Sequence, residues 1–264
     1  MIKRISFICG FHPHPQTFLK KSLTKNFHFC ERNYLFHFCE RNSIEKFILA
    51  GEQMNPQDIE KKSFEIITEI MQKEYPDIKI PQEQQSIVKR VIHTTADFEY
   101  LHTLCFCNDA VKRGKQALKK GISIVTDTQM VKSGINKKAV ERLGSEVYCF
   151  MSDEYVAEQS KKQNTTRAFA SMDKAAQMQK ELIFAIGNAP TALIRLHELI
   201  QQNKIIPPAL IIAVPVGFVN VVQSKELILS LDVPCIVAKG RKGGSNVAAA
   251  ICNALLYEII PNVL

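Results

Sequence analysis

The sequence lacks any hydrophobic run long enough to cross a membrane. None of its apolar stretches approaches the ~20 residues that a transmembrane helix needs, which excludes a helical integral membrane protein. A convincing signal peptide is missing as well. The short apolar stretch after Lys3 and Arg4 is interrupted by His12-Pro13-His14-Pro15, and no small-residue cleavage site follows. We therefore expect a cytoplasmic protein.

Paired cysteine motifs are also absent. The chain has eight cysteines but no CxxC pair, and several lie in apolar runs typical of buried strands, such as Cys149 in residues 146–151. Reduced thiols packed in a core explain this distribution better than a disulfide framework. No GxxxxGK(S/T) pattern occurs either, so a nucleotide-binding P-loop is unsupported.

What is present fits a globular protein with a basic surface. The 264 residues, 46% of them hydrophobic, suffice for one large domain or for a domain with an appendage. The formal net charge of +8 favours acidic partners without naming them. Nucleic acid, an anionic membrane surface and a polycarboxylate ligand all fit that charge.

Residues 1–53 differ in texture from the rest of the chain. The seven-residue segment Phe27–Asn33 recurs as Phe36–Asn42, with alternating phenylalanine, histidine and cysteine. Such side chains can bind soft metals, but the repeat lacks a ligand spacing known for zinc, so we expect no metal site. We expect instead a poorly ordered extension, or a translated stretch upstream of a true start at Met54.

From Met54 onward, helical patterns alternate with short runs rich in β-branched residues. This alternation predicts a three-layer α/β/α fold with a mostly parallel central sheet. The predicted strands are Ile122–Thr126, Val147–Met151, Leu182–Ile186, Leu210–Val214 and Cys235–Ala238. The predicted helices cover residues 59–71, 109–119, 137–143, 153–163, 192–202 and 247–257.

Four polar or glycine-rich segments follow predicted strands. They are Asp127-Thr128, Gly187–Pro190, Pro215–Phe218 and Gly240–Gly244. Ligands of open parallel sheets bind beyond the carboxyl ends of the strands. We therefore expect these four segments to cluster along one edge of the sheet and to form the binding site.

The loop from Gly240 to Asn246 precedes an alanine-rich helix. A glycine-rich turn into a helix N-terminus presents free backbone N–H groups and the positive end of the helix dipole, which suits an anion. Arg241 and Lys242 add full charges, and arginine can bind a carboxylate with two hydrogen bonds. The alternative is a tight loop capped by Ser245 or Asn246. We predict an anion site.

Three further positions are weaker candidates for the same site. Asn188 lies in a strand-to-helix turn, where an asparagine also has a purely conformational use. Lys225 is a candidate second anion contact, although a solvated helix face explains it equally well. Arg167 follows the predicted helix at 153–163, from which it can reach the same edge or simply face solvent.

The segment Arg90–Tyr100 reads RVIHTTADFEY and places His93 among β-branched residues, ahead of two carboxylates. Histidine is the side chain whose unperturbed pKa lies near neutrality, so it can exchange protons under cellular conditions. A lone histidine beside apolar residues is more often a structural group. Local sequence leaves both interpretations open.

Taken together, these segments resemble the precorrin-8X methylmutase family of cobalamin biosynthesis. The resemblance covers Met54 to about residue 260, leaves residues 1–53 outside, and departs from the expected pattern at Asn220 and Gln223. Its five motifs, in one order, are RVIHTTADFEY at 90–100, TDTQMVKSGI at 126–135, GNAPTAL at 187–193, PVGFVNVVQSKE at 215–226 and GRKGGSNVAAAICNAL at 240–255.

The resemblance implies an isomerase that moves a methyl group from carbon 11 to carbon 12 of precorrin-8 or cobalt-precorrin-8, giving hydrogenobyrinate or cobyrinate. It assigns the proton transfer to His93, with Asp97 or Glu99 as residues that adjust its protonation, and implies no cofactor and no metal. The implied substrate contacts are Ser63, Arg90, Asn136, Arg167, Asn188, Arg241, Lys242, Gly243, Gly244 and Ser245. Asn136 stands where threonine is expected.

The implied partner is the tetrapyrrole substrate, with no nucleic acid and no membrane. The resemblance also implies a homodimer with sites near the subunit interface. Two alternatives remain open on the sequence. One is a non-catalytic tetrapyrrole carrier with the same anion-rich cleft, and the other is a nucleotide- or phosphate-binding α/β enzyme, suggested by the loop at 240–246.

Overall fold

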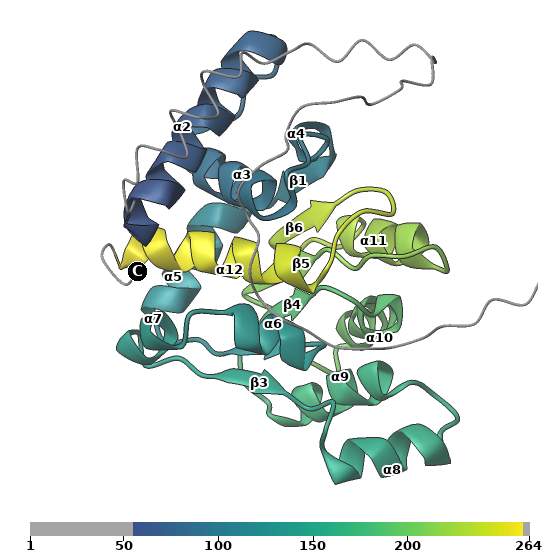
Figure 1. The fold of residues 1–264 in the computed structure, drawn as a ribbon. Helices are drawn as coiled ribbons and strands as arrows, with labels where there is room; N and C mark the ends of the chain where they lie inside the picture. Colours follow the sequence, from purple (N-terminus) through teal and green to yellow (C-terminus); the bar gives the residue numbers. More distant parts are fainter. Residues whose placement is uncertain (1–54, 261–264) are drawn as a thin grey trace, which may run out of the picture. The chain divides into compact units, whose positions relative to one another are not determined.

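A computed structural model describes residues 55–260. Its six-stranded sheet has the order β1-β6-β5-β4-β2-β3, in which five strands run parallel and β1 pairs antiparallel with β6 (Figure 1). The mostly parallel sheet predicted from the sequence is therefore confirmed. The strands are β1 (Leu104–Cys107), β2 (Ile124–Thr126), β3 (Val147–Cys149), β4 (Ile183–Ile186), β5 (Leu210–Ala213) and β6 (Cys235–Ala238).

Strand β1 was missed, and the other strands are up to two residues shorter than predicted. All four residues of β1 are half-buried, because the strand lies at the edge of the sheet. Its sequence, LCFC, is a short apolar run, but it directly follows a one-turn helix, with no turn residue to separate the two elements. Because β3 is the opposite edge strand, Cys149 is half-buried rather than buried as expected. The cysteines of the described part are all free thiols.

Helices cover both faces of the sheet, as the three-layer prediction requires. On one face Ile183 and Ala185 pack in a core with residues of α3, α5 and α12, and on the other Phe184 and Ile186 pack with residues of α9 and α10. The helices are α2 (Pro56–Glu74), α3 (Gln82–Thr95), α4 (Tyr100–Thr103), α5 (Ala110–Lys119), α6 (Gln129–Gly134), α7 (Lys137–Arg142), α8 (Glu154–Lys162), α9 (Arg167–Gln177), α10 (Pro190–Gln201), α11 (Val221–Leu229) and α12 (Ser245–Ile259).

Helix α12 starts at the carboxyl edge of the sheet and ends beside the start of α3. Its alanines allow α3 and the sheet to pack closely against it, and Val247, Ile251 and Leu255 are buried there. Helix α2 in turn lies along α3 (Figure 1). Ser86 and Arg90 of α3 contact Glu258 and Tyr257 near the end of α12, so α3 is held between α2 and α12. No helix within residues 55–260 is long and apolar enough to span a bilayer.

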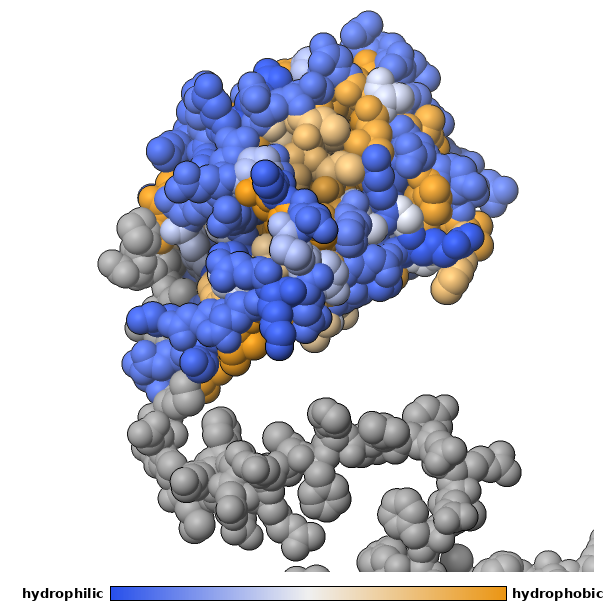
Figure 2. Space-filling model, turned by 90° about the horizontal axis from the view of Figure 1, so that it is seen from above, coloured by the Kyte–Doolittle hydropathy of each residue, from blue (hydrophilic) through white to orange (hydrophobic). Residues whose placement is uncertain are grey.

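Several large apolar side chains remain exposed near the carboxyl ends of the strands. Phe218 and Val219, after β5, are 86% and 79% exposed, and Met130, after β2, is 70% exposed. Figure 2 shows hydrophobic patches within an otherwise mostly hydrophilic surface. The predicted extension at 1–53 and its histidine and cysteine repeat lie outside the described residues.

Candidate active site

The polar segments that follow the strands come together, as the sequence predicts. The buried carboxylate of Asp127, after β2, accepts the backbone N–H groups of Gly187, Asn188 and Ala189 at 2.7 to 2.9 Å. The hydroxyls of Thr128 and Ser245 lie 3.0 Å apart. The segments after β2, β4 and β6 therefore meet at one edge of the sheet.

Two glycines allow this close approach. A Cβ atom on Gly187 would lie 2.7 Å from the Cα of Ser245, so no side chain fits between the two loops. Gly243 has φ +157°, and its Cβ would lie 2.1 Å from the carbonyl oxygen of Val214 at the end of β5. The loop after β6 thus crosses the end of β5 to reach β4.

His93 lies in the last turn of α3 with an exposed side chain. Its Nδ1 atom is 2.7 Å from the hydroxyl oxygen of Ser63, and the ring of Phe64 lies edge-on at 5.4 Å between centroids. Both neighbours come from the face of α2 that packs against α3. Within residues 55–260, the Nε2 atom has no hydrogen-bond partner, so it is free to meet a ligand.

Arg90 lies one turn before His93 and already has several partners. Its guanidinium is 2.5 Å from a carboxylate oxygen of Glu60 and lies over the rings of Phe64 and Tyr257, at 5.2 and 4.6 Å from their centroids. The charge of Arg90 is thus paired and partly covered. A ligand carboxylate would have to share this guanidinium with Glu60.

Tyr257 also brings Asn136 to this part of the site. The amide nitrogen of Asn136 is 3.2 Å from the Tyr257 hydroxyl, and its amide oxygen accepts the backbone N–H of Ala139 at 3.1 Å, which caps α7. The Asn136 side chain therefore has a structural use at the position where the sequence predicts a substrate contact.

Lys242 joins the glycine-rich loop to the segment after His93. Its Nζ atom lies 2.5 Å from Asp97 and 2.6 Å from Glu99. The hydrogen bond from Lys242 holds the pKa of Asp97 below its usual value, and both carboxylates raise the pKa of Lys242. These carboxylates were expected to adjust His93. They bind Lys242 instead, and the group bonded to His93 is the Ser63 hydroxyl.

Arg241 is exposed and makes no ion pair with the described part of the chain. The alternative interpretation, a tight loop capped by Ser245 or Asn246, is wrong: the N-cap of α12 is Gly244, and no side chain caps the helix. Its first N–H groups therefore remain available for an anion. The side chain of Asn188 is also exposed, while its backbone N–H is bonded to Asp127.

Arg167 is exposed at the start of α9. The hydroxyl of Thr166, the residue before it, lies 2.8 Å from that of Thr191 in the first turn of α10. Arg167 is thereby placed beside the segment that follows β4.

The prediction that Lys225 faces solvent or a ligand anion is wrong. Its side chain is fully buried, and Nζ donates to the carbonyl oxygens of Gly240 and Lys242, both at 2.8 Å. A lysine after a predicted helix start looks the same in sequence whether it faces water or the interior. The side-chain direction depends on how the loops fold over it.

Sequence reasoning also missed Glu60 and Tyr257 as partners of Arg90. For Glu60 a signal exists, because Glu60, Ser63 and Phe64 have the spacing that places residues on one face of a helix. Tyr257 lies 167 positions after Arg90 in the sequence, so no local pattern predicts the contact. In residues 55–260, no cluster of three or more His, Cys, Asp or Glu side chains forms a metal site.

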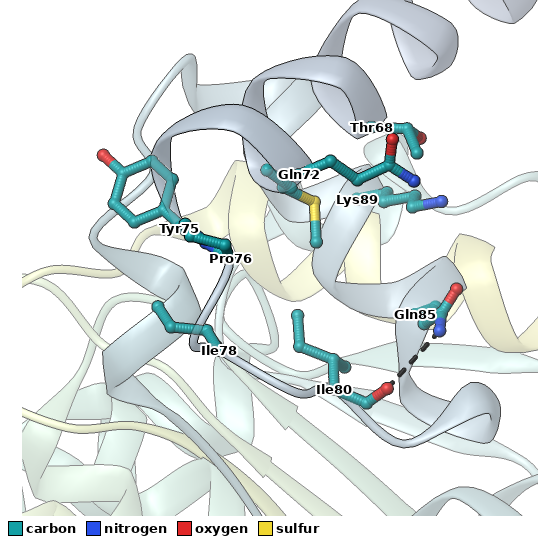
Figure 3. A pocket seen from close by; sticks show the side chains of 9 residues that line it. Thr68, Gln72, Tyr75, Pro76, Ile78, Ile80, Gln85 and Lys89 are labelled. Atoms are coloured by element: carbon teal, nitrogen blue, oxygen red, sulfur yellow. Dashed lines mark hydrogen bonds between the residues drawn. The ribbon is translucent and has the colours of Figure 1, made fainter.

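A separate hollow lies between α2 and α3. Figure 3 shows Gln72 of α2, the loop at 75–80, and Gln85 and Lys89 of α3 around it. The hollow has a volume of about 170 Å³. Ligand pockets usually measure about 300–1,000 Å³. None of its lining residues belongs to the cluster around His93, so we do not assign the site to it.

The chain is similar to proteins of one family. The family model described as precorrin-8X methylmutase matches residues 58–258. A cobalt-precorrin-8 methylmutase of Leptospira interrogans is 47% identical over 208 residues, which are 76% of this chain and 92% of that protein. One from Salmonella typhimurium is 45% identical over 206 residues, 77% of this chain and 96% of that protein.

A solved structure agrees with these matches. The precorrin-8X methyl mutase from Thermus thermophilus aligns with a TM-score of 0.68 and 34% sequence identity. The alignment covers 78% of this chain and 99% of that one. The similarity therefore extends over nearly the whole length of these relatives.

We predict that Asp127→Asn lowers the free energy of unfolding by about 2–4 kcal/mol, because an amide cannot accept all three N–H groups that converge on the carboxylate. Burial raises the pKa of this carboxyl while the three N–H groups oppose that rise. Urea unfolding measures the loss. The exposed Asp77→Asn variant is the control and should stay within about 0.5 kcal/mol of the original protein; an equal effect of both variants would contradict the prediction.

Proposed function

The chain belongs to the precorrin-8X methylmutase family, and from this we propose that it moves a methyl group from carbon 11 to carbon 12 of precorrin-8 or its cobalt form. It is an isomerase, an intramolecular transferase of cobalamin biosynthesis. The bond from the methyl to carbon 11 breaks as the bond to carbon 12 forms. The reaction needs no external methyl donor, and its product is hydrogenobyrinate or cobyrinate.

The single observation that carries the mechanism is the pairing of His93 with Ser63. The hydroxyl holds one ring nitrogen at 2.7 Å and leaves the other for the substrate. His93 donates a proton at or near the ring nitrogen beside the migrating methyl and takes it back afterwards. A proton there draws electron density from the conjugated system and favours migration, a general-acid contribution of about 10²- to 10⁴-fold.

The carboxyl edge of the sheet offers groups that match the substrate's acetate and propionate carboxylates. Arg241 has no ion pair within residues 55–260, and the backbone N–H groups of Gly243 and Ser245 stand at the start of α12. The N–H of Gly244 is bonded to the Val214 carbonyl, so we propose that Gly244 contacts the substrate through the close approach of its backbone. The remaining proposed contacts are Ser63, Arg90, Asn136, Arg167, Asn188 and Lys242. No cofactor, metal, nucleic acid or membrane has a part in this proposal.

Exposed apolar side chains support the same assignment. Phe218 and Val219 lie after β5, and Met130 lies after β2. The loops after β4 and β6, at the same edge of the sheet, carry proposed polar contacts. A flat conjugated ring needs apolar surface for its faces and charged groups for its edge, which is the usual division of a ligand site. We assign the faces of the macrocycle to these three side chains.

A homodimer with the site near the subunit interface forms part of the proposal. Ile59 and Ile66 are exposed on α2, the helix that carries Ser63, with 53% and 45% of their surface accessible. Burying such side chains against a second copy would remove apolar surface from water next to His93. The cytoplasmic location stays a prediction from the sequence.

We predict that His93→Ala lowers turnover of precorrin-8 by at least about 100-fold. Its affinity for the product should stay within about threefold, because the carboxylate contacts are intact. The visible spectrum follows conversion to the corrin chromophore, and titration with cobyrinate gives the affinity. The control is His102→Ala, an exposed histidine that contacts the ring of Tyr75 and should leave turnover unchanged.

Unchanged turnover in the His93→Ala variant would remove His93 from the mechanism. Tight binding without turnover in the original protein would favour the tetrapyrrole carrier over the enzyme. Stabilisation by nucleotides but not by corrinoids, in a thermal-shift screen, would favour the phosphate-binding alternative.

Arg241→Ala should weaken cobyrinate binding by about 10- to 100-fold, because a charged hydrogen-bond donor to a carboxylate is lost. The loss should shrink as salt is added, since exposed charges are screened. Titration at two ionic strengths measures both effects. Arg113→Ala is the matched control, because this exposed arginine lines a hollow with Pro207 and Pro234 ahead of β5 and β6, at the opposite edge. Equal losses for both variants would contradict the assignment.

A further inference from the structure

Among residues 55–260, Lys225 is a buried cation without an anionic partner. Its side chain, on α11, is 0% exposed, and no carboxylate in the described part of the chain forms an ion pair with it. Its partners are two backbone carbonyl oxygens, those of Gly240 and Lys242. Desolvation lowers the pKa of Lys225 to about 8.

Burying a charged side chain in a core costs free energy. An ammonium group loses its hydration on burial, and two neutral carbonyls return only part of that free energy. An apolar side chain of similar length would avoid this cost. The contribution of Lys225 must therefore be sought in what its two hydrogen bonds hold in place.

The loop that it holds has little conformational preference of its own. Gly240, Gly243 and Gly244 have φ angles of +77°, +157° and +141°, a region that glycine enters without preferring it over others. Two other backbone bonds tie the loop to its neighbours, from Gly217 N–H to the Arg241 carbonyl at 3.2 Å and from Gly244 N–H to the Val214 carbonyl at 2.8 Å.

The bonds from Lys225 lie on either side of Arg241. Together with the bond from Gly217, they turn three successive carbonyls, of residues 240, 241 and 242, toward the protein. The side chains of Arg241 and Lys242 are exposed as a result. Arg241 has no ion pair with the part of the chain that the structure describes, and Lys242 binds Asp97 and Glu99 in the segment after His93.

We propose that Lys225 is a positioning residue for substrate binding, which fixes the loop at 240–244 so that Arg241 meets a substrate carboxylate. It touches no substrate itself. This inference rests on the proposed function only for the identity of the ligand. Its physical content is that one buried ammonium group determines the direction of an exposed guanidinium.

A double-mutant cycle between Lys225 and Arg241 tests the proposal. Lys225→Met in the full chain should weaken cobyrinate binding by about 10- to 100-fold, comparable with the loss of the Arg241 contact. In an Arg241→Ala background, the same substitution should cost less than about threefold, because the group that it positions is gone. Additive losses would overturn the proposal, since general destabilisation does not depend on Arg241.

Ser224→Ala is the matched control. Ser224 is the neighbouring residue, equally buried, and its hydroxyl donates to the carbonyl of Val221 within the same helix. This variant loses a buried hydrogen bond but leaves the loop untouched. Its cobyrinate affinity should stay within about twofold of the original protein; a loss equal to that of Lys225→Met would overturn the proposal.

Amide hydrogen exchange gives a readout that needs no ligand. Exchange within residues 240–244 should be at least about tenfold faster in Lys225→Met than in the original protein and unchanged in Ser224→Ala. Unchanged exchange in Lys225→Met would overturn the proposal. If the original protein fails to bind cobyrinate, the proposed function fails, while this measurement still decides whether Lys225 holds the loop.

Lys225→Gln keeps the experiment decisive if the methionine variant does not fold. Its shorter amide retains two N–H donors, so it should give a smaller affinity loss and slower exchange than a side chain without donors. The cycle with Arg241→Ala is then measured on this variant. Additivity there overturns the proposal in the same way.

Discussion

The site depends on one buried carboxylate. Asp127 can only accept hydrogen bonds when ionised, so it needs several donors to replace the water that it loses. Three successive N–H groups supply them, and they belong to the segment that links β4 to α10. That segment must therefore bend over the end of β2. Gly187 then packs directly against Ser245, and this contact restricts the path of the loop after β6.

Asp127 and Lys225 both hold loops in place through hydrogen bonds to the backbone, with opposite charge. Each is a buried ion whose hydrogen-bond partners, among the described residues, are backbone groups: N–H donors for one and carbonyl acceptors for the other. An ion pair between side chains would fix two side chains, whereas these contacts fix backbone. The loops are thereby shaped from the inside, and the charged side chains that they carry, above all Arg241, stay free to bind a ligand.

The sequence allowed the layers of the fold to be predicted because buried parallel strands are continuous apolar runs, as in Ile183–Ile186. Strand β1 is a run of only four apolar residues that directly follows α4, so nothing in the sequence separates it from the preceding helix. The cluster of loops at one edge follows from the topology alone. The contact of Ser63 with His93 does not, because it joins two helices 30 positions apart.

The electrostatics of the site follow from these pairings. A substrate with several carboxylates is repelled by free acidic groups, and Asp97 and Glu99 lie close behind His93 in the chain. Lys242 binds both and offsets one of their two negative charges where the substrate would approach. His93 itself is held by a neutral hydroxyl, which orients the imidazole without adding an anion beside the polycarboxylate. The charge of Arg241, unpaired within residues 55–260, then adds the positive sign that a polycarboxylate ligand requires.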